Sequence, residues 1–137
     1  MREIKFRAWD TTNKKMLVPL SGIIWGKPII PMDYCYGLFN GERPDNYDSM
    51  LEEMMIVDDC ILMEFTGRID RLGKEVYEGD IVQGDAIDVQ GIVTWISTLP
   101  GFTILNPEKT GAFVLHGGWQ IIGNIYENGD LLEEAQA

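Results

Sequence analysis

A single histidine and several acidic pairs are the residues of this chain whose types and spacing could do chemistry. His116, followed by Gly117 and Gly118, could act as a general base beside a flexible loop. No serine or cysteine stands in a nucleophile-type motif that would use such a base. We therefore interpret His116 as an ordinary turn histidine.

Two carboxylates flank a glycine in Glu78-Gly79-Asp80, a spacing that could form an acid–base pair. A structural role explains it better, because Gly79 permits a backbone conformation closed to other residues and Asp80 can accept hydrogen bonds from nearby amides. We predict no catalytic residue, no cofactor and no enzymatic activity. Other acidic pairs could bind Mg²⁺ or Ca²⁺, but they lack calcium-loop spacing and are typical of a solvated face; they are Glu52-Glu53, Asp58-Asp59 and Asp85 with Asp88.

The two cysteines, Cys35 and Cys60, could in principle pair, but two cysteines without a secretory signal more often stay reduced. Cys60 lies in an apolar run and is interpreted as a small buried hydrophobe. With one histidine and no close cysteine pair, the chain falls short of the ligand clusters of zinc and iron–sulfur sites. We expect no disulfide and no metal site.

The formal net charge is −11, from 22 acidic and 11 basic residues. This disfavours nucleic acid as a partner, because duplexes are bound largely by neutralising their phosphates. A local basic edge could still act, since the acidic bulk is screened beyond ~8 Å at physiological salt. We interpret the basic residues of the first 15 positions as solvent-facing residues of an N-terminal hairpin; they are Arg2, Lys5, Arg7, Lys14 and Lys15.

The 137 residues have the length of one ordinary domain, and such a domain buries about 70% of its unfolded surface. No apolar run reaches the ~18 residues of a membrane span. Charged residues interrupt the N-terminus where a signal peptide needs an apolar core. We expect a cytoplasmic protein without membrane contact.

The first part of the chain predicts one β-hairpin followed by irregular structure. Apolar and charged residues alternate over 4–9, and residues 16–18 return after a polar turn. Prolines and glycines interrupt residues 19–44 and leave room for short strands at 23–25 and 28–30.

Residues 45–59 are the best helix candidate of the chain. Asp48 or Ser49 could cap the run 50–55, and acidic residues fall in its first turn, where the helix dipole favours them. A short helix is therefore expected here.

From residue 60 onward the sequence predicts short strands separated by tight turns. The run 89–97 is rich in β-branched and aromatic residues, and Leu99-Pro100-Gly101 turns the chain into 102–105. This is the most clearly predicted hairpin. Short strands with close turn spacing are typical of a small closed β-barrel; the others are expected at 60–66, 81–83, 112–115 and 119–126.

Three separated blocks, residues 4–10, 66–82 and 122–128, resemble the YopX family in order and spacing across almost the whole chain. The resemblance implies a small protein of bacteriophages and prophages, mainly β, with an SH3-like barrel in the C-terminal half. It also implies that the expected cytoplasm is that of a bacterial host cell. It implies no established activity and hence no catalytic residues. The motif positions that carry it are interpreted as structural: Gly67, Tyr77, Glu78, Gly79, Asp80, Gly123, Asn124 and Tyr126.

We expect a single YopX-like domain over residues 1–137. Its hairpin and irregular extension would occupy 1–60, its barrel strands 61–128 and a C-terminal tail 129–137.

The irregular segment is the predicted interaction surface, because long loops rich in aromatic residues, prolines and glycines are often functional. We expect a non-enzymatic protein-interaction or self-assembling module, acting as a homo-oligomer or with a protein partner. A nucleic-acid-binding accessory β-barrel that uses the basic N-terminal strand is the alternative. The aromatic residues of the predicted surface are Trp25, Tyr34, Tyr36, Phe39 and Tyr47.

Overall fold

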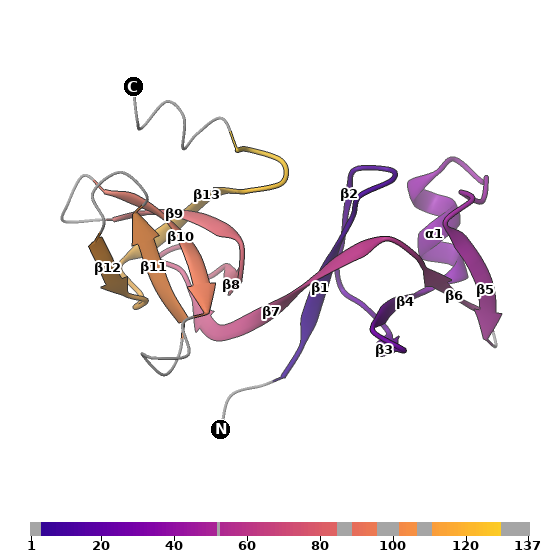
Figure 1. Cartoon of the computed structure of the whole chain (residues 1–137), viewed down its shortest axis with the longest axis horizontal. Helices are drawn as coiled ribbons and strands as arrows, with labels where there is room; N and C mark the ends of the chain where they lie inside the picture. The colour runs from indigo at the N-terminus through magenta and orange to yellow at the C-terminus, as the bar shows by residue number, and fades with distance from the viewer. Residues whose placement is uncertain (1–3, 52, 85–88, 96–101, 107–110, 130–137) are drawn as a thin grey trace. The chain divides into compact units, whose positions relative to one another are not determined.

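The described part of the protein is mainly β, with one short helix (Figure 1). The chain divides into two compact units: Phe6–Met63, here the N-terminal unit, and Met1–Lys5 with Glu64–Ala137, here the C-terminal unit. The predicted mainly β class is confirmed, and the SH3-like barrel stays a prediction. The computed structural model describes residues 4–51, 53–84, 89–95, 102–106 and 111–129.

The boundary between the units falls within one strand, β7, Cys60–Ile69. This strand stands third in the order β2-β1-β7-β8. It pairs antiparallel with β8, Glu75–Tyr77, where Phe65 faces Tyr77. The strand predicted over 60–66 is therefore confirmed, and the single domain stays a prediction.

The N-terminal unit begins with the predicted hairpin. β1, Phe6–Asp10, pairs antiparallel with β2, Lys15–Leu17, and Ala8 faces Leu17 in register. Both of these side chains are fully buried, so the hairpin register is set by the face that meets the core. The hairpin prediction is confirmed.

The segment predicted to be irregular, residues 19–44, holds two of the four strands of an antiparallel sheet with the order β3-β4-β6-β5. The short strands predicted at 23–25 and 28–30 are confirmed as β3, Gly22–Ile24, and β4, Lys27–Pro31. α1, Met32–Leu38, follows β4 directly, where no helix was expected. A helix of two turns is too short to leave a clear periodic signal in the sequence.

The helix predicted over residues 45–59 is wrong. This segment forms the hairpin of β5, Tyr47–Leu51, and β6, Met54–Val57. β6 also pairs with β4 on its other side, and its last three residues are buried. Backbone pairing on both sides and the burial of β-branched residues outweigh the helix propensity of the methionines and glutamates.

The core of the N-terminal unit combines side chains from the β1–β2 hairpin, the β5–β6 hairpin, strand β4 and helix α1. Both cysteines are free: Cys35 is the buried residue of α1, whereas Cys60 is only partly buried against the core, less than the sequence interpretation expected. Burial raises the pKa of the Cys60 thiol to about 12, with the nearby Asp10 carboxylate adding to the effect. The buried cluster is Ala8, Leu17, Ile30, Cys35, Tyr47, Met55 and Val57.

The C-terminal unit contains a five-stranded antiparallel sheet with the order β12-β11-β10-β9-β13 (Figure 1). The pairing of the most clearly predicted hairpin is confirmed, because β10 pairs with β11 and Trp95 faces Phe102. The turn predicted at Leu99-Pro100-Gly101 lies outside the described residues. The other predicted strands are confirmed with shifted ends. The strands are β9, Asp80–Gly84; β10, Gln90–Trp95; β11, Phe102–Asn106; β12, Gly111–Val114; and β13, Trp119–Asn124.

Close packing fixes one glycine at the centre of this sheet. A Cβ on Gly91 would lie 2.5 Å from Cγ2 of Ile104 and 2.9 Å from the carbonyl oxygen of Leu105. Only glycine therefore allows β10 and β11 to approach as they do. The buried cluster of this unit is Val76, Val82, Val89, Val93, Ile104, Leu115 and Trp119.

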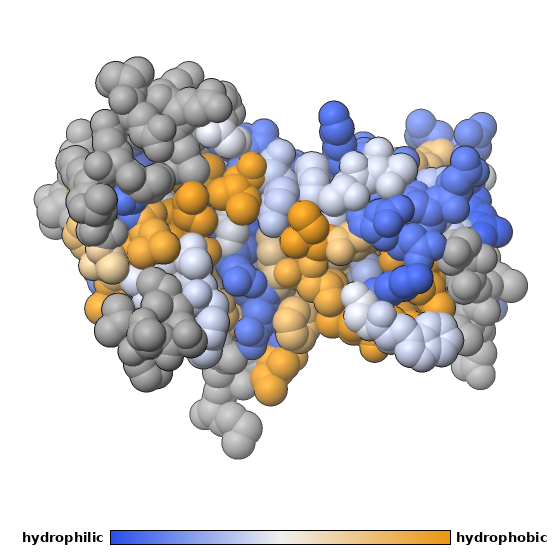
Figure 2. Space-filling model, in the orientation of Figure 1, coloured by the Kyte–Doolittle hydropathy of each residue, from blue (hydrophilic) through white to orange (hydrophobic). Residues whose placement is uncertain are grey.

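Apolar residues also reach the surface of the molecule. Figure 2 shows orange apolar residues among the blue hydrophilic ones on the face in view. The most exposed large apolar side chains of the described residues include Trp25, Val114 and Ile4, each more than 70% exposed. None of the described helical residues forms a stretch long and apolar enough to cross a membrane.

Candidate functional site

The acidic corner Glu78-Gly79-Asp80 connects β8 to β9 and is held together by backbone hydrogen bonds. Gly79 has a φ of 91°, which other residues rarely adopt. The Asp80 carboxylate is 2% exposed, and its Oδ2 accepts a hydrogen bond from the Tyr77 amide at 2.8 Å. The Gly79 amide donates to the carbonyl oxygen of Val93 at 2.9 Å. The two carboxylates thus belong to a structural corner whose inner member is closed to solvent.

Asn124 organises the turn at the end of β13. Its Oδ1 accepts hydrogen bonds from the amides of Tyr126 at 3.0 Å and Glu127 at 2.9 Å. The backbone amide of Asn124 donates to Oδ1 of Asn128 at 3.2 Å. A Cβ on Gly123 would lie 2.6 Å from that same Asn128 oxygen. The last sequence block is therefore a turn that needs glycine and asparagine at these positions.

Asp70, which the sequence interpretation missed, plays the same part at the turn after β7. Its Oδ1 accepts the amides of Leu72 at 2.9 Å and Lys74 at 2.8 Å, and its Oδ2 accepts the amide of Ile121 at 3.0 Å. Burial by itself raises the pKa of Asp70, but the three amide donors outweigh it and the net pKa is lowered. An Asp two residues before Leu72 and three before Gly73 was the available signal.

Gly67, another motif position, lies in an irregular part of β7. Its φ is 85°, and the pairing with β8 shifts register between Phe65 and Ile69. The hydroxyl of Thr66 donates to the carbonyl oxygen of Val76 at 2.7 Å. Gly67 therefore serves the bulge of this strand pair.

His116 accepts a hydrogen bond at Nδ1 from the Gly118 amide at 3.0 Å, and its ring lies 6.0 Å from that of Trp119. This is the local geometry of a turn. Within the described residues, no group of three or more His, Cys, Asp or Glu side chains could hold a metal ion. The acidic residues Asp85 and Asp88 lie outside the described part of the chain.

The aromatic residues of the predicted interaction surface differ widely in exposure. Trp25 is 79% exposed, whereas Tyr34, Tyr36 and Phe39 are half-buried. Tyr47 is fully buried and packs edge-on against Phe39, with ring centroids 5.5 Å apart. The expectation that Tyr47 lies on the surface is wrong, because strand β5 turns its side chain into the core.

Trp25 and Gly26 form the two-residue turn between β3 and β4, since Ile24 pairs with Lys27. Their φ values are 53° and 74°. Hairpins of this kind use a type I′ turn, which requires positive φ at both positions and favours Asn-Gly. A bulky aromatic residue at the first position costs about 1–2 kcal/mol of backbone strain. Neither the turn nor the core explains why a tryptophan stands there.

Comparison with known proteins decides the kinship of the chain. A protein-family model described as YopX protein matches residues 5–133. The chain belongs to the YopX family. No protein with a curated description matches the sequence.

This YopX chain also shares its fold with protein EF1440 from Enterococcus faecalis, which is known from a crystal structure. The similarity covers 96% of this chain and 99% of the other, with a TM-score of 0.60 and 22% sequence identity. At that identity the likeness supports the arrangement of the strands and extends to no activity.

The basic residues of the YopX chain are only partly available. Lys5 forms an ion pair with Glu75 of β8 and lies over an aromatic ring. Arg7 is 8% exposed, whereas Lys14 and Lys15 are exposed in the turn and strand of the first hairpin. Of the basic residues that the sequence suggested as a basic edge, Lys14 and Lys15 are therefore the exposed ones among the described residues of the first hairpin.

Proposed function

We propose that this protein is a non-enzymatic protein-interaction module of a bacteriophage or prophage, which acts in the bacterial cytoplasm as a homo-oligomer or with a protein partner. The observation that carries the proposal is Trp25. This residue combines 79% exposure with a φ of 53°, so its backbone costs folding free energy while its ring contributes little burial in return. Tryptophan is also one of the residue types enriched among those that dominate binding energy at protein interfaces.

The interface would be anchored by the tip of the β3–β4 hairpin. Ile23, the residue of β3 that pairs with Pro28, is 38% exposed, so the apolar character of the tip continues onto the strand. β3 is also an edge strand of its sheet in the order β3-β4-β6-β5. An exposed edge next to an aromatic anchor suits partner binding by contact or by strand addition.

The experiment compares the wild type with Trp25→Asn by light scattering coupled to size exclusion, across protein and salt concentrations, and by affinity capture of bacterial proteins. Association should weaken at least tenfold in the variant, because removal of an anchoring tryptophan costs on the order of 2 kcal/mol or more. Equal association of the two proteins, or a wild type that stays monomeric and captures nothing specific, contradicts the proposal.

An SH3-type closure of the C-terminal unit is part of the same proposal. Its five short antiparallel strands with one buried cluster support this arrangement. NMR can test whether backbone hydrogen bonds join β12 to β13, the two edge strands of this sheet, and so close it into a barrel. Backbone amides that exchange freely with solvent in both strands would contradict a closed barrel.

Nucleic-acid binding is the second candidate, and the exposed pair Lys14 and Lys15 favours it. Binding to DNA or RNA that weakens as salt rises, and that Lys14→Gln with Lys15→Gln removes, would support it. The net charge of −11 is the reason for ranking it second.

A further inference from the structure

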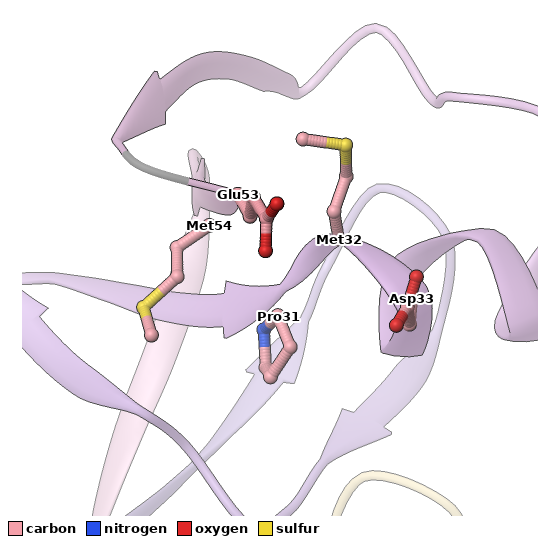
Figure 3. Close-up of a pocket in the computed structure, with 5 residues that line it drawn as sticks. All are labelled: Pro31, Met32, Asp33, Glu53 and Met54. Atoms are coloured by element: carbon pink, nitrogen blue, oxygen red, sulfur yellow. The ribbon is translucent and has the colours of Figure 1, made fainter.

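A hollow of about 460 Å³ lies in the N-terminal unit, away from the turn of Trp25 along β4. Its walls come from the end of β4, the start of α1 and the turn before β6 (Figure 3). Backbone contacts fix these walls: Pro31 pairs with Met54, and the Met32 amide donates to the Glu53 carbonyl oxygen at 2.9 Å. The lining residues are Pro31, Met32, Asp33, Glu53 and Met54.

The described residues that line the hollow include two carboxylates and no cation. Asp33 and Glu53 are both exposed, and neither makes an ion pair or a side-chain hydrogen bond with any other described residue. Figure 3 shows the Glu53 carboxylate directed into the space between the side chains of Met32 and Met54. Apolar, deformable thioether side chains therefore flank a free negative charge.

The backbone at Glu53 is strained as well. Glu53 follows β5 and precedes β6 with a φ of 70°, in the left-handed region that favours Gly, Asn or Asp. The turn would be better served by one of those residues, and the Glu53 side chain contributes nothing to the core. An outlier of this kind indicates that the side chain is kept for another purpose.

A basic side chain fits this hollow better than a metal ion does. Hard cations need more oxygen ligands than two carboxylates supply, and the described residues offer no group of three or more ligands. Arginine and lysine carry an apolar stem that can lie on Met32, Met54 and Pro31, while the charged head pairs with the carboxylates. The volume exceeds that of one side chain and falls in the range of ligand pockets, which leaves room for flanking residues.

We propose that this hollow binds an arginine or lysine side chain of a partner polypeptide, whose neighbouring apolar residues contact the two methionines. The inference deepens the proposed interaction function by giving the partner its chemistry. It depends on Asp33 and Glu53 and is independent of Trp25, so the two ideas can fail separately.

The test titrates the full chain, labelled with ¹³C at its methionine methyl groups, with the acetylated, amidated peptide Gly-Leu-Arg-Leu-Gly. Lysine and citrulline versions of the peptide separate the effect of charge from that of shape. We expect saturable shifts of the Met32 and Met54 signals with the arginine and lysine peptides, and binding of the neutral citrulline peptide that is at least about fivefold weaker. Absence of shifts at these two methionines up to millimolar arginine peptide overturns the proposal.

Two double variants separate the site from net charge. Asp33→Asn with Glu53→Gln should weaken binding about five- to thirtyfold, the range expected for two partly exposed ion pairs. Glu42→Gln with Asp45→Asn removes the same two charges from exposed positions outside the hollow and should leave binding unchanged. Equal losses in both double variants would mean attraction by net charge alone. Mg²⁺ or Ca²⁺ that produces the same methionine shifts and displaces the peptide would identify a metal site instead.

Discussion

Replacing Trp25 by asparagine separates folding from function at a single position. Trp25 and Gly26 form a two-residue turn with φ values of 53° and 74°, and Asn-Gly is the sequence that such turns favour. The substitution therefore supplies the residue that the backbone prefers and removes the ring that the proposed interface uses.

The expected change in stability is small and favourable. Relief of the left-handed strain is worth about 1–2 kcal/mol, since asparagine tolerates this region far better than an aromatic residue. Trp25 is 79% exposed, so loss of its remaining burial, roughly 40 Å² of an aromatic side chain, costs about 1 kcal/mol. The free energy of unfolding should stay unchanged or rise by up to ~1 kcal/mol.

Urea unfolding followed by circular dichroism measures this change, and light scattering measures association of the same samples. Trp25→Ala is the matched control, because it removes the same ring but keeps a residue that disfavours positive φ. Trp25→Asn should be more stable than Trp25→Ala by about 0.5–1 kcal/mol while both lose association. Loss of more than ~1 kcal/mol in the asparagine variant would refute the reasoning, because it would mean that the ring packs as part of the fold.

Three further predictions concern the core and its charged groups. Asp70→Asn should lower the free energy of unfolding at pH 7 by about 1–3 kcal/mol, because the new side-chain nitrogen cannot accept an amide hydrogen bond. The pKa of Asp70 is lowered in the folded chain, so the ionised Asp70 side chain stabilises the fold above the unfolded pKa of about 3.9. This stabilisation is lost as pH falls through the folded pKa. Urea titrations at several acidic pH values should show the loss in the wild type and a weaker loss in the variant. With a pKa of about 12, the Cys60 thiol should react with Ellman's reagent at pH 8 at least tenfold more slowly in the folded chain than in urea; equal rates would contradict the raised pKa of this partly buried thiol. Gly91→Ala should destabilise the C-terminal unit by about 1–3 kcal/mol in thermal or urea unfolding, whereas Gly117→Ala, where a Cβ meets nothing within 4 Å, should not.

Alternating and β-branched segments of this sequence predicted the strands well. The pairing of β10 with β11 could be predicted from residues alone, because the β-branched run before Trp95 and the turn-favouring Pro-Gly sequence after it give consistent local signals. The run 50–55 gave a misleading signal, since methionine and glutamate favour helices while pairing with β4 and β5 requires a strand. That pairing is tertiary information, which no local pattern contains.

The candidate site was only partly predictable for a similar reason. Trp25 could be named because an aromatic residue between short strands stands out, but Tyr47 carries the same signal and is buried against Phe39. Whether an aromatic side chain on a strand faces solvent or the core depends on the register of that strand. A shift of the register by one residue moves the side chain to the other face of the sheet. Asp33 and Glu53 are distant in sequence and line the same hollow because β4 and β6 pair, so no local sequence pattern could predict this hollow.

Backbone strain is distributed unevenly between the two units, and this bears on where function resides. The described positive-φ residues of the C-terminal unit are Gly67, Gly73 and Gly79, so each such position carries the residue that its backbone favours. In the N-terminal unit, Lys14, Trp25 and Glu53 occupy such positions at hairpin turns that Asn or Gly would suit better. Of these three residues, Trp25 and Glu53 belong to the two proposed binding features. Sequences depart from local rules mainly where function requires a particular side chain. A double variant, Trp25→Asn with Glu53→Asn, should therefore be at least as stable as the wild type yet fail to associate, whereas a stability loss would place both side chains in the service of the fold.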